Sequence, residues 1–335
     1  MAFSRETNLG FYFIFGMCTF FIWCDLSFFS ELSEKGVSNN VTKSGRPVAT
    51  IKLRMQDHFA HYLYLPFCNW VETAFKISEI PGVTPNLITL IHFVFAMIAG
   101  RFMADADLSW RRLGAVIFEM RSCLDILDGV VYRSQSHSTK FMSGHGTLGW
   151  YLDSGADTLG SLFFAAGVYV YYNKFPPVKT KGTIKDMKLK DEESAVKLLS
   201  DGSADEDEAS HSKRKRFSRK AINVTITLYA IQVFLRSALW DHFLQAYNEL
   251  LDRPVAGVSP ALQAKILHYH STWLMLWSWK IFSADAFLHY SMVATFFNKL
   301  WSWMRFWVIL GPAILAVHCL IVQLHVIQVR SWLGI

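Results

Sequence analysis

The sequence reads DILDGVVYR from Asp125 onwards and GWYLDSGAD up to Asp157, so four aspartates stand in two apolar segments joined by a short connection. Asp125 and Asp128 are three residues apart, and Asp153 and Asp157 are four residues apart. In an α-helix, either spacing places both side chains on one face. The short connection makes the two helices neighbours, so the two pairs are predicted to converge on one point.

The four carboxylates need a partner. Each would cost roughly 3 kcal/mol if it stayed charged near the centre of a membrane helix, and mutual repulsion would add to that cost. A divalent cation removes both costs, and a set of oxygen ligands favours a hard ion such as Mn²⁺ or Mg²⁺. The sequence therefore predicts a Mn²⁺ or Mg²⁺ site formed by Asp125, Asp128, Asp153 and Asp157.

Basic residues offer an alternative, in which the acids only hold helices together by pairing with Arg121, Arg133 or Lys140. This alternative does not account for Gly129 and Gly149, which lie beside the acids. A missing side chain at these positions would let a nucleotide or a neighbouring helix come close. Arg133 would present a planar fork of donors to a phosphate group.

The composition indicates an integral membrane protein. Of the 335 residues, 52% are hydrophobic and only 18% are charged, and the mean hydropathy is +0.23. The net charge of +6 indicates contact with anionic lipid rather than with nucleic acid. An all-α membrane fold is expected, because seven stretches could cross roughly 30 Å of hydrocarbon as helices: 10–29, 86–104, 113–133, 147–173, 221–247, 272–296 and 304–327.

Residues 174–220 break the apolar pattern with an acidic run, a basic run and 13 Lys or Arg residues. Such a segment buries too little apolar surface to fold, and its positive charge places it in the cytoplasm. Alternation of the helices then puts the N-terminus in the cytoplasm, and a glycosylation sequon at Asn40 on the lumenal side agrees. The expected organisation is an N-terminal anchor (1–30), a lumenal segment (31–85) and a membrane core (86–335) with a disordered cytoplasmic loop.

The pattern around the aspartates resembles the signature of the CDP-alcohol phosphotransferases, which are integral membrane enzymes with six core helices. It runs Asp125-x2-Asp128-Gly129-x2-Tyr132-Arg133-x15-Gly149-x3-Asp153-x3-Asp157. The run Thr84-Pro-Asn86-Leu-Ile-Thr89 is similar to the start of the first core helix in that family. The resemblance covers about three quarters of the chain, because the helices within 86–327 supply all six core spans. It implies a six-helix core preceded by one extra N-terminal membrane helix.

Two departures from the common family pattern narrow the resemblance. Tyr132 stands where a small alanine is usual, and the spacer of fifteen residues after Arg133 is longer than usual. Both features resemble the ceramide phosphoethanolamine synthase branch, whose active site faces the Golgi lumen. The charge pattern also puts the aspartates at the lumenal end of their helices. The resemblance therefore implies a Golgi enzyme that transfers phosphoethanolamine from CDP-ethanolamine to the primary hydroxyl of ceramide and releases CMP.

The resemblance also assigns roles to individual positions. The four aspartates would hold one or two metal ions against the pyrophosphate, and Asp157 would also be the general base for the attacking hydroxyl. The nucleotide would be bound by Asn86, Thr89, Gly129, Arg133 and Gly149. Members of this family often form dimers, so a homodimer is left open.

Two other functions fit parts of the sequence. The same chemistry with diacylglycerol as the acceptor would make an ethanolamine- or choline-phosphotransferase, and neither head group nor acceptor can be read from single residues. A metal-ion transporter would place its acids near mid-membrane along a continuous polar path, whereas these acids cluster at one end of two helices. Six ionisable residues are left without a role: Arg236, Asp241, Lys280, Asp285, His137 and His145.

Overall fold

The computed structural model describes residues 5–34, 50–136, 148–178 and 216–335. Within these ranges the chain is helical, and the only extended pairing is an isolated bridge between Val178 and Arg216. The predicted all-α class is therefore confirmed. The predictions for the Asn40 sequon, for His137 and His145, and for most of the cytoplasmic loop concern positions outside the described residues.

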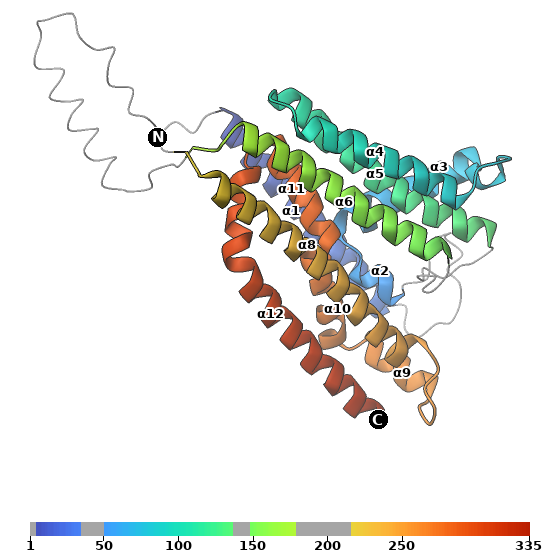
Figure 1. Cartoon of the computed structure of the whole chain (residues 1–335). Helices are drawn as coiled ribbons and strands as arrows, with labels where there is room; N and C mark the ends of the chain where they lie inside the picture. The colour runs from blue at the N-terminus through green and yellow to red at the C-terminus, as the bar shows by residue number, and fades with distance from the viewer. Residues whose placement is uncertain (1–4, 35–49, 137–147, 179–215) are drawn as a thin grey trace, which may run out of the picture.

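Long helices run in similar directions through the molecule (Figure 1). They are α1 (Arg5–Glu34), α4 (Pro85–Met103), α5 (Leu108–Gln135), α6 (Leu148–Lys174), α8 (Arg219–Tyr247) and α12 (Leu300–Leu333). A π-helical segment (Asn248–Asp252) and α9 (Pro260–Leu267) follow α8. Among the described residues, four helices are long and apolar enough to cross a membrane: α1, α4, α8 with its π-helical extension, and α12. This is a multi-pass membrane protein, and the number of seven spans stays a prediction.

The predicted span 272–296 consists of two shorter helices. α10 (His270–Phe282) ends at Ser283, whose extended backbone separates it from α11 (Ala284–Phe296). The Ser283 hydroxyl accepts a hydrogen bond from the backbone N–H of Ala286 at 3.2 Å and so caps α11. The prediction of one continuous helix was wrong here, because a capping serine can start a new helix inside an apolar run.

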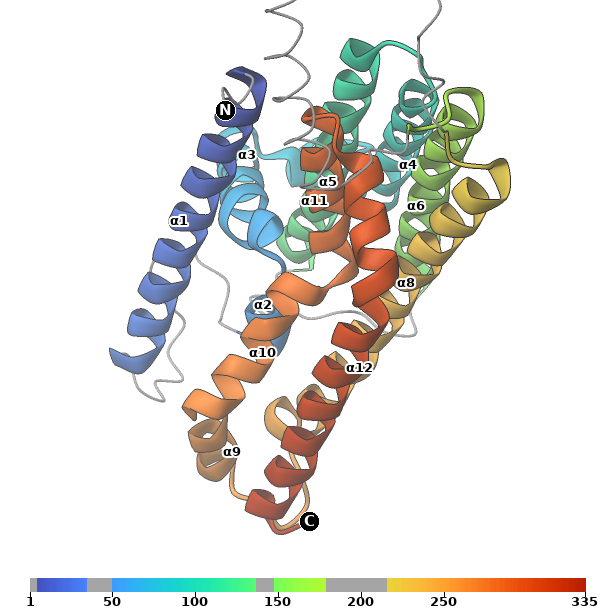
Figure 2. The same ribbon diagram turned by 90° about the vertical axis from the view of Figure 1, so that its left-hand side faces the viewer.

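The close packing of α4 against α6 depends on glycine. A Cβ atom on Gly167 would lie 2.1 Å from the backbone oxygen of Gly100, and one on Gly100 would lie 2.5 Å from the backbone oxygen of Phe163. Neither position therefore accepts a side chain unless a helix moves. Because α4 also packs along α5, the helices α4, α5 and α6 lie side by side (Figure 2).

Residues 50–83, which were expected to lead from the lumen to the core, fold into short elements that pack on the bundle. These elements are α2 (Ile51–Met55), a π-helix (Ala60–Tyr64), α3 (Leu65–Phe75) and a 3₁₀ turn (Ile77–Glu79). Leu53, Leu65 and Cys68 are buried in a small apolar cluster with Val130 of α5. Apolar burial therefore holds this segment against the helix that carries Asp125 and Asp128.

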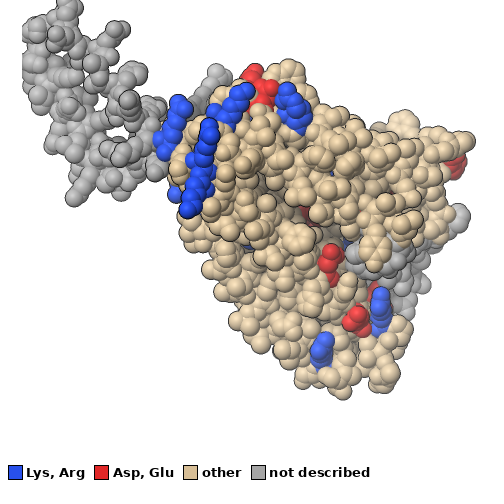
Figure 3. Space-filling view, in the orientation of Figure 1, with Lys and Arg blue, Asp and Glu red and all other residues tan. Residues whose placement is uncertain are grey.

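Charged side chains are unevenly distributed over the surface. Lys and Arg gather at the end of the bundle where α6 ends and α8 begins, whereas most of the same face is uncharged (Figure 3). Large apolar side chains are exposed along the long helices, among them Phe15, Trp23, Leu90, Phe234 and Leu320. Because a soluble protein rarely exposes so much apolar surface, the bundle surface fits a lipid environment.

Candidate metal centre

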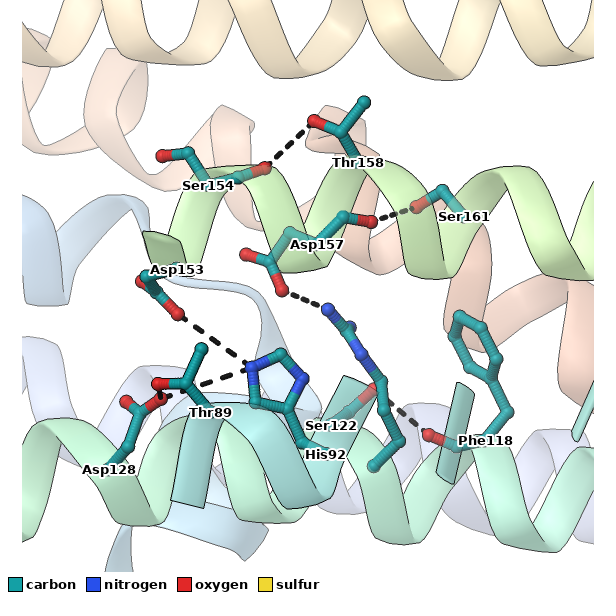
Figure 4. A network of polar contacts seen from close by, with 11 residues as sticks. Thr89, His92, Phe118, Ser122, Asp128, Asp153, Ser154, Asp157, Thr158 and Ser161 are labelled. Carbon is teal, nitrogen blue, oxygen red and sulfur yellow. Dashed lines mark hydrogen bonds and ion pairs between the residues drawn. The ribbon is translucent and has the colours of Figure 1, made fainter. Parts of the chain in front are cut away.

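Three helices bring four potential metal ligands together. α5 supplies Asp125 and Asp128, α6 supplies Asp153, and α4 supplies His92. One ligand atom from each residue lies within 4.8 Å of the others. The Nε2 atom of His92 is 3.9 Å from Oδ1 of Asp153 and 4.0 Å from Oδ2 of Asp128 (Figure 4). The structure thus brings three of the four predicted aspartates together with a histidine.

Several polar atoms of this group have no hydrogen-bond partner in the described part of the chain. They are both ring nitrogens of His92 and Oδ1 of Asp153, and the His92 side chain is fully buried. A buried polar group left unsatisfied costs roughly 1–3 kcal/mol. A divalent cation would satisfy three carboxylates and an imidazole together, and this set of oxygen and nitrogen ligands suits such an ion. The residues present therefore fit a metal ion.

Thr89 supports the group from α4, one turn before His92. Its hydroxyl donates a hydrogen bond to Oδ2 of Asp128 at 2.8 Å, and the Asp128 side chain is buried. Hydrogen bonds of this kind commonly orient metal ligands. Thr89 was predicted to contact the nucleotide; the structure places it against a candidate metal ligand, and the nucleotide contact stays a prediction.

Asp157 lies outside this group of four. Its carboxylate forms an ion pair with the guanidinium of Arg121, which precedes Asp125 by one turn on α5. The Arg121 side chain is 3% exposed, whereas that of Asp157 is 42% exposed and lines a cavity. The pairing with Arg121, which the sequence offered as an alternative for the acids in general, is therefore present at Asp157.

A cavity of about 950 Å³ lies beside these residues. Its polar end is lined by the four aspartates and by all five residues predicted to bind the nucleotide: Asn86, Thr89, Gly129, Arg133 and Gly149. Its other arm is lined mainly by apolar side chains of α6 and α8, among them Leu162, Val168, Ile226, Val233 and Phe234. One cavity thus joins an acidic end to an apolar arm.

The two predicted glycines differ in the space around them. A Cβ atom on Gly129 would lie 3.3 Å from Nη1 of Arg133, so a side chain there would press on the guanidinium. A Cβ atom on Gly149 would lie 3.8 Å from Oδ1 of Asn86, which is an ordinary contact distance. Gly129 is therefore the position where a small residue matters more for the shape of the polar end.

Sequence reasoning missed three residues at the polar end. They are His92 on α4 and two residues of the α2 region that line the cavity, Lys52 and Gln56. The signal for His92 was an ionisable side chain inside an apolar span. Lys52 and Gln56 gave no signal, because nothing in the sequence shows that their segment folds back onto the bundle.

Other ionisable residues within the predicted spans connect helices. The ammonium group of Lys280 is 2.5 Å from Nδ1 of His61, and Arg236 donates a hydrogen bond to the backbone oxygen of Phe282 at 3.2 Å. These two residues join separate parts of the chain. The other two without an assigned role line the cavity: Asp241 and Asp285.

The fold and the site define a multi-pass, all-α membrane protein with an aspartate and histidine cluster that could hold a metal ion. The chain belongs to the ceramide phosphoethanolamine synthase family, whose profile matches residues 37–334. It is similar to the protein named ceramide phosphoethanolamine synthase in Drosophila melanogaster, with 29% identity over 287 residues, which cover 85% of this chain and 69% of that relative. No solved structure matches it significantly. The predicted resemblance to this family is confirmed.

Proposed function

We propose that this chain is a CDP-alcohol phosphotransferase that transfers phosphoethanolamine from CDP-ethanolamine to the primary hydroxyl of ceramide and releases CMP. The cavity carries the proposal, because it joins a candidate metal-binding group to an apolar arm. The name of the family and of the Drosophila relative supports ceramide as the acceptor and phosphoethanolamine as the group transferred. The aspartate pattern supports a CDP-linked donor, because it resembles the CDP-alcohol phosphotransferase signature.

The polar end of the cavity would hold the donor. His92, Asp125, Asp128 and Asp153 would hold Mn²⁺ or Mg²⁺, which when bound neutralises charge on the pyrophosphate. Arg133 from α5 and Lys52 from α2 line the same end and would add positive charge next to the phosphate oxygens. Phosphoryl transfer depends mainly on positioning and on charge neutralisation, so residues of these types suit the reaction.

Asp157 would accept the proton of the attacking hydroxyl. Its carboxylate lines the cavity, and the ion pair with Arg121 fixes its position. In the transfer, the ceramide oxygen bonds to phosphorus, the bond between phosphorus and the CMP oxygen breaks, and the hydroxyl proton moves to Asp157. Leu162, which belongs to the apolar arm, follows Asp157 on the same helix by little more than one turn. A base at Asp157 would therefore stand where the donor and acceptor regions meet.

The apolar arm would take the hydrocarbon chains of the acceptor. Leu162 of α6 and Phe234 of α8 line it and are more than half exposed. Their exposure supports access for a lipid from the membrane between α6 and α8. An acceptor bound in this way would keep its chains in an apolar environment while its hydroxyl reached Asp157.

The site would face the lumen of the Golgi, with the N-terminus in the cytoplasm. Asp128 lies near the end of α5 and Asp153 near the start of α6, away from the basic end of the bundle. The positive-inside rule supports this orientation. Asn40 should then carry a glycan, and cytosolic protease should cut within residues 174–220. An unglycosylated Asn40 together with protection of residues 174–220 from the protease would reverse the orientation.

An assay of the purified full-length protein in phospholipid nanodiscs with Mn²⁺ tests the reaction. CDP-ethanolamine or CDP-choline is combined with ceramide or diacylglycerol, and the lipid products are separated. Ceramide phosphoethanolamine and CMP should form fastest in the pairing of CDP-ethanolamine with ceramide. Product from diacylglycerol alone would instead make the protein an ethanolamine- or choline-phosphotransferase. No product from any pairing, with Mn²⁺ crossing sealed vesicles, would favour a transporter.

A further inference from the structure

Asp285 stands at the break between α10 and α11, inside a stretch that the sequence predicts as one membrane span. It is the second residue of α11, directly after the capping Ser283 and Ala284. Irregular backbone within a membrane protein is tolerated where protein covers it or where it lines a cavity. Here both Ala284 and Asp285 line the cavity that also contains the metal-binding group.

The side chain of Asp285 is exposed to this cavity. The residues on either side of it, from Ser283 to His289, are all buried, whereas Asp285 is exposed. On the α8 wall of the same cavity lie Ser237 and Ala238, which are exposed as well. The carboxylate of Asp285 therefore faces the interior space and not a packed helix interface.

Asp285 also differs from the acids near it in its hydrogen bonds and salt bridges. On the same helix, His289 places Nδ1 2.7 Å from Oε2 of Glu119 and Nε2 3.5 Å from Oδ1 of Asp57. Asp157 has its ion pair with Arg121. Within the described part of the chain, no hydrogen bond or salt bridge of Asp285 is found, and its one favourable electrostatic neighbour is His289. An ionisable side chain at such a depth usually has a functional partner, and the cavity is the space open to it.

Burial and the neighbouring acids oppose ionisation of Asp285, whereas the imidazole of His289 and the start of α11 favour it. Asp285 lies in the first turn of α11, where the partial positive charge of the helix N-terminus stabilises a carboxylate. An ionised carboxylate only accepts hydrogen bonds. A ligand group that contacts the ionised Asp285 must therefore bring a donor.

We propose that Asp285 selects the acceptor lipid by accepting a hydrogen bond from a donor next to the hydroxyl that is phosphorylated. This inference rests on the proposed function. Ceramide has two such donors, the amide N–H and the secondary hydroxyl, on the two carbon atoms that follow the one bearing the primary hydroxyl. Diacylglycerol has ester oxygens near its hydroxyl instead. These oxygens cannot donate a hydrogen bond, and their partial negative charge is repelled by a carboxylate.

The cavity places this selection beside the reacting atoms. Asp157 and Asp285 line the same cavity, and Asp285 lies within electrostatic range of Asp157 and Asp125. A ceramide with its primary hydroxyl at Asp157 would then bring its amide and secondary hydroxyl towards the wall that includes Asp285. A site built to hydrogen-bond a substrate donor rejects an analogue without that donor, because the polar group is then left unpaired.

The test compares acceptors in wild type, Asp285→Asn and Asp285→Ala, all with CDP-ethanolamine and Mn²⁺. The acceptors are ceramide, an N-methyl ceramide, a ceramide without the secondary hydroxyl, and diacylglycerol. In wild type, loss of the donor that Asp285 contacts should lower kcat/KM by about 10–100-fold, the range for a lost hydrogen bond to a charged group. In Asp285→Ala this analogue should perform like ceramide, and the preference for ceramide over diacylglycerol should fall by the same factor.

Two controls keep the result interpretable. Calorimetry of CDP-ethanolamine binding shows that each variant is folded, because Asp285 should not alter donor affinity. Asp252→Asn, in the π-helical segment after α8, should leave the acceptor preference unchanged. The inference is overturned if folded Asp285 variants keep the wild-type preference, or if wild type accepts both donor-deficient ceramides as well as ceramide. Absence of transfer to ceramide in wild type would instead refute the proposed function itself.

Discussion

Removal of His92 tests the composition of the metal-binding group directly. His92 supplies one of four ligand atoms that lie within 4.8 Å of one another, and in the described part of the chain its ring nitrogens have no hydrogen-bond partner. Loss of a residue that only supports a metal ligand lowers affinity by about 10–100-fold. Loss of a ligand should cost at least as much, so we expect His92→Ala to weaken Mn²⁺ binding by about 100-fold, or about 2.7 kcal/mol.

The measurement is the Mn²⁺ affinity of the purified protein without nucleotide, by electron paramagnetic resonance of free Mn²⁺. His92→Gln accompanies His92→Ala, because it nearly keeps the side-chain volume and limits any effect of a cavity in the core. His318→Gln is the matched control: this buried histidine of α12 donates or accepts a hydrogen bond with Ser278 at 2.7 Å, far from the aspartates in sequence and outside the cavity lining. It should bind Mn²⁺ as wild type does.

The comparison with Asp157 decides between two ligand sets. Asp157→Asn should change Mn²⁺ affinity by no more than a few fold, because Asp157 pairs with Arg121 outside the group of four. Wild-type Mn²⁺ affinity in both His92 variants, with a large loss in Asp157→Asn, would refute the reasoning. That result would instead support the set of four aspartates predicted from the sequence.

Three further predictions concern chemistry and packing. EDTA should abolish transfer and Mn²⁺ should restore it; full turnover in chelator would contradict a metal-dependent reaction. Asp157→Asn should bind CDP-ethanolamine with Mn²⁺ as wild type does, while transfer falls by about 10²–10⁴-fold, the range for a lost general base; calorimetry and turnover are measured together, and near-normal turnover would remove the base role. Gly167→Ala should destabilise the protein by about 1–3 kcal/mol, because its Cβ atom would lie 2.1 Å from the backbone oxygen of Gly100. Its control is Gly155→Ala on the same helix, where a Cβ atom meets nothing within 4 Å; equal thermal stability of the two variants would show that α4 and α6 separate at little cost.

The sequence predicted the helices correctly where the apolar runs were long. The prediction failed where a helix-capping residue lay inside such a run. The all-α class and helices close to the bounds of α4, α5, α6 and α8 followed from apolar length alone. The division at Ser283 did not, although Ser283 with Asp285 two residues later has the residue types of a helix start. Residues 272–296 form an apolar run long enough to cross a membrane, so the run was predicted as one helix despite these residue types.

The site was predictable within each helix but not between helices. Spacing placed Asp125 with Asp128 on one face, and the short connection brought Asp153 close to them. The sequence did not show that Asp157 pairs with Arg121. The spacing of Asp157 from Asp153 is compatible both with metal binding and with this ion pair. His92 required knowledge that α4 packs against α5 and α6, which depends on glycines such as Gly167.

The attachment of α2 has a consequence for how the protein is made. Arg54 donates a hydrogen bond to the backbone oxygen of Leu267 at 2.7 Å, and Trp240 donates one to the backbone oxygen of Met55 at 3.2 Å. The ribosome synthesises α2 near the start of the chain, and these partners follow it by 185 and 213 residues. Such non-local contacts form late, because the long intervening chain must be ordered first. In a nascent chain that has inserted all four aspartates but not yet Trp240 and Leu267, the wall that carries Lys52 and Gln56 is therefore held only by the apolar contacts of Leu53 with Val130 and its neighbours.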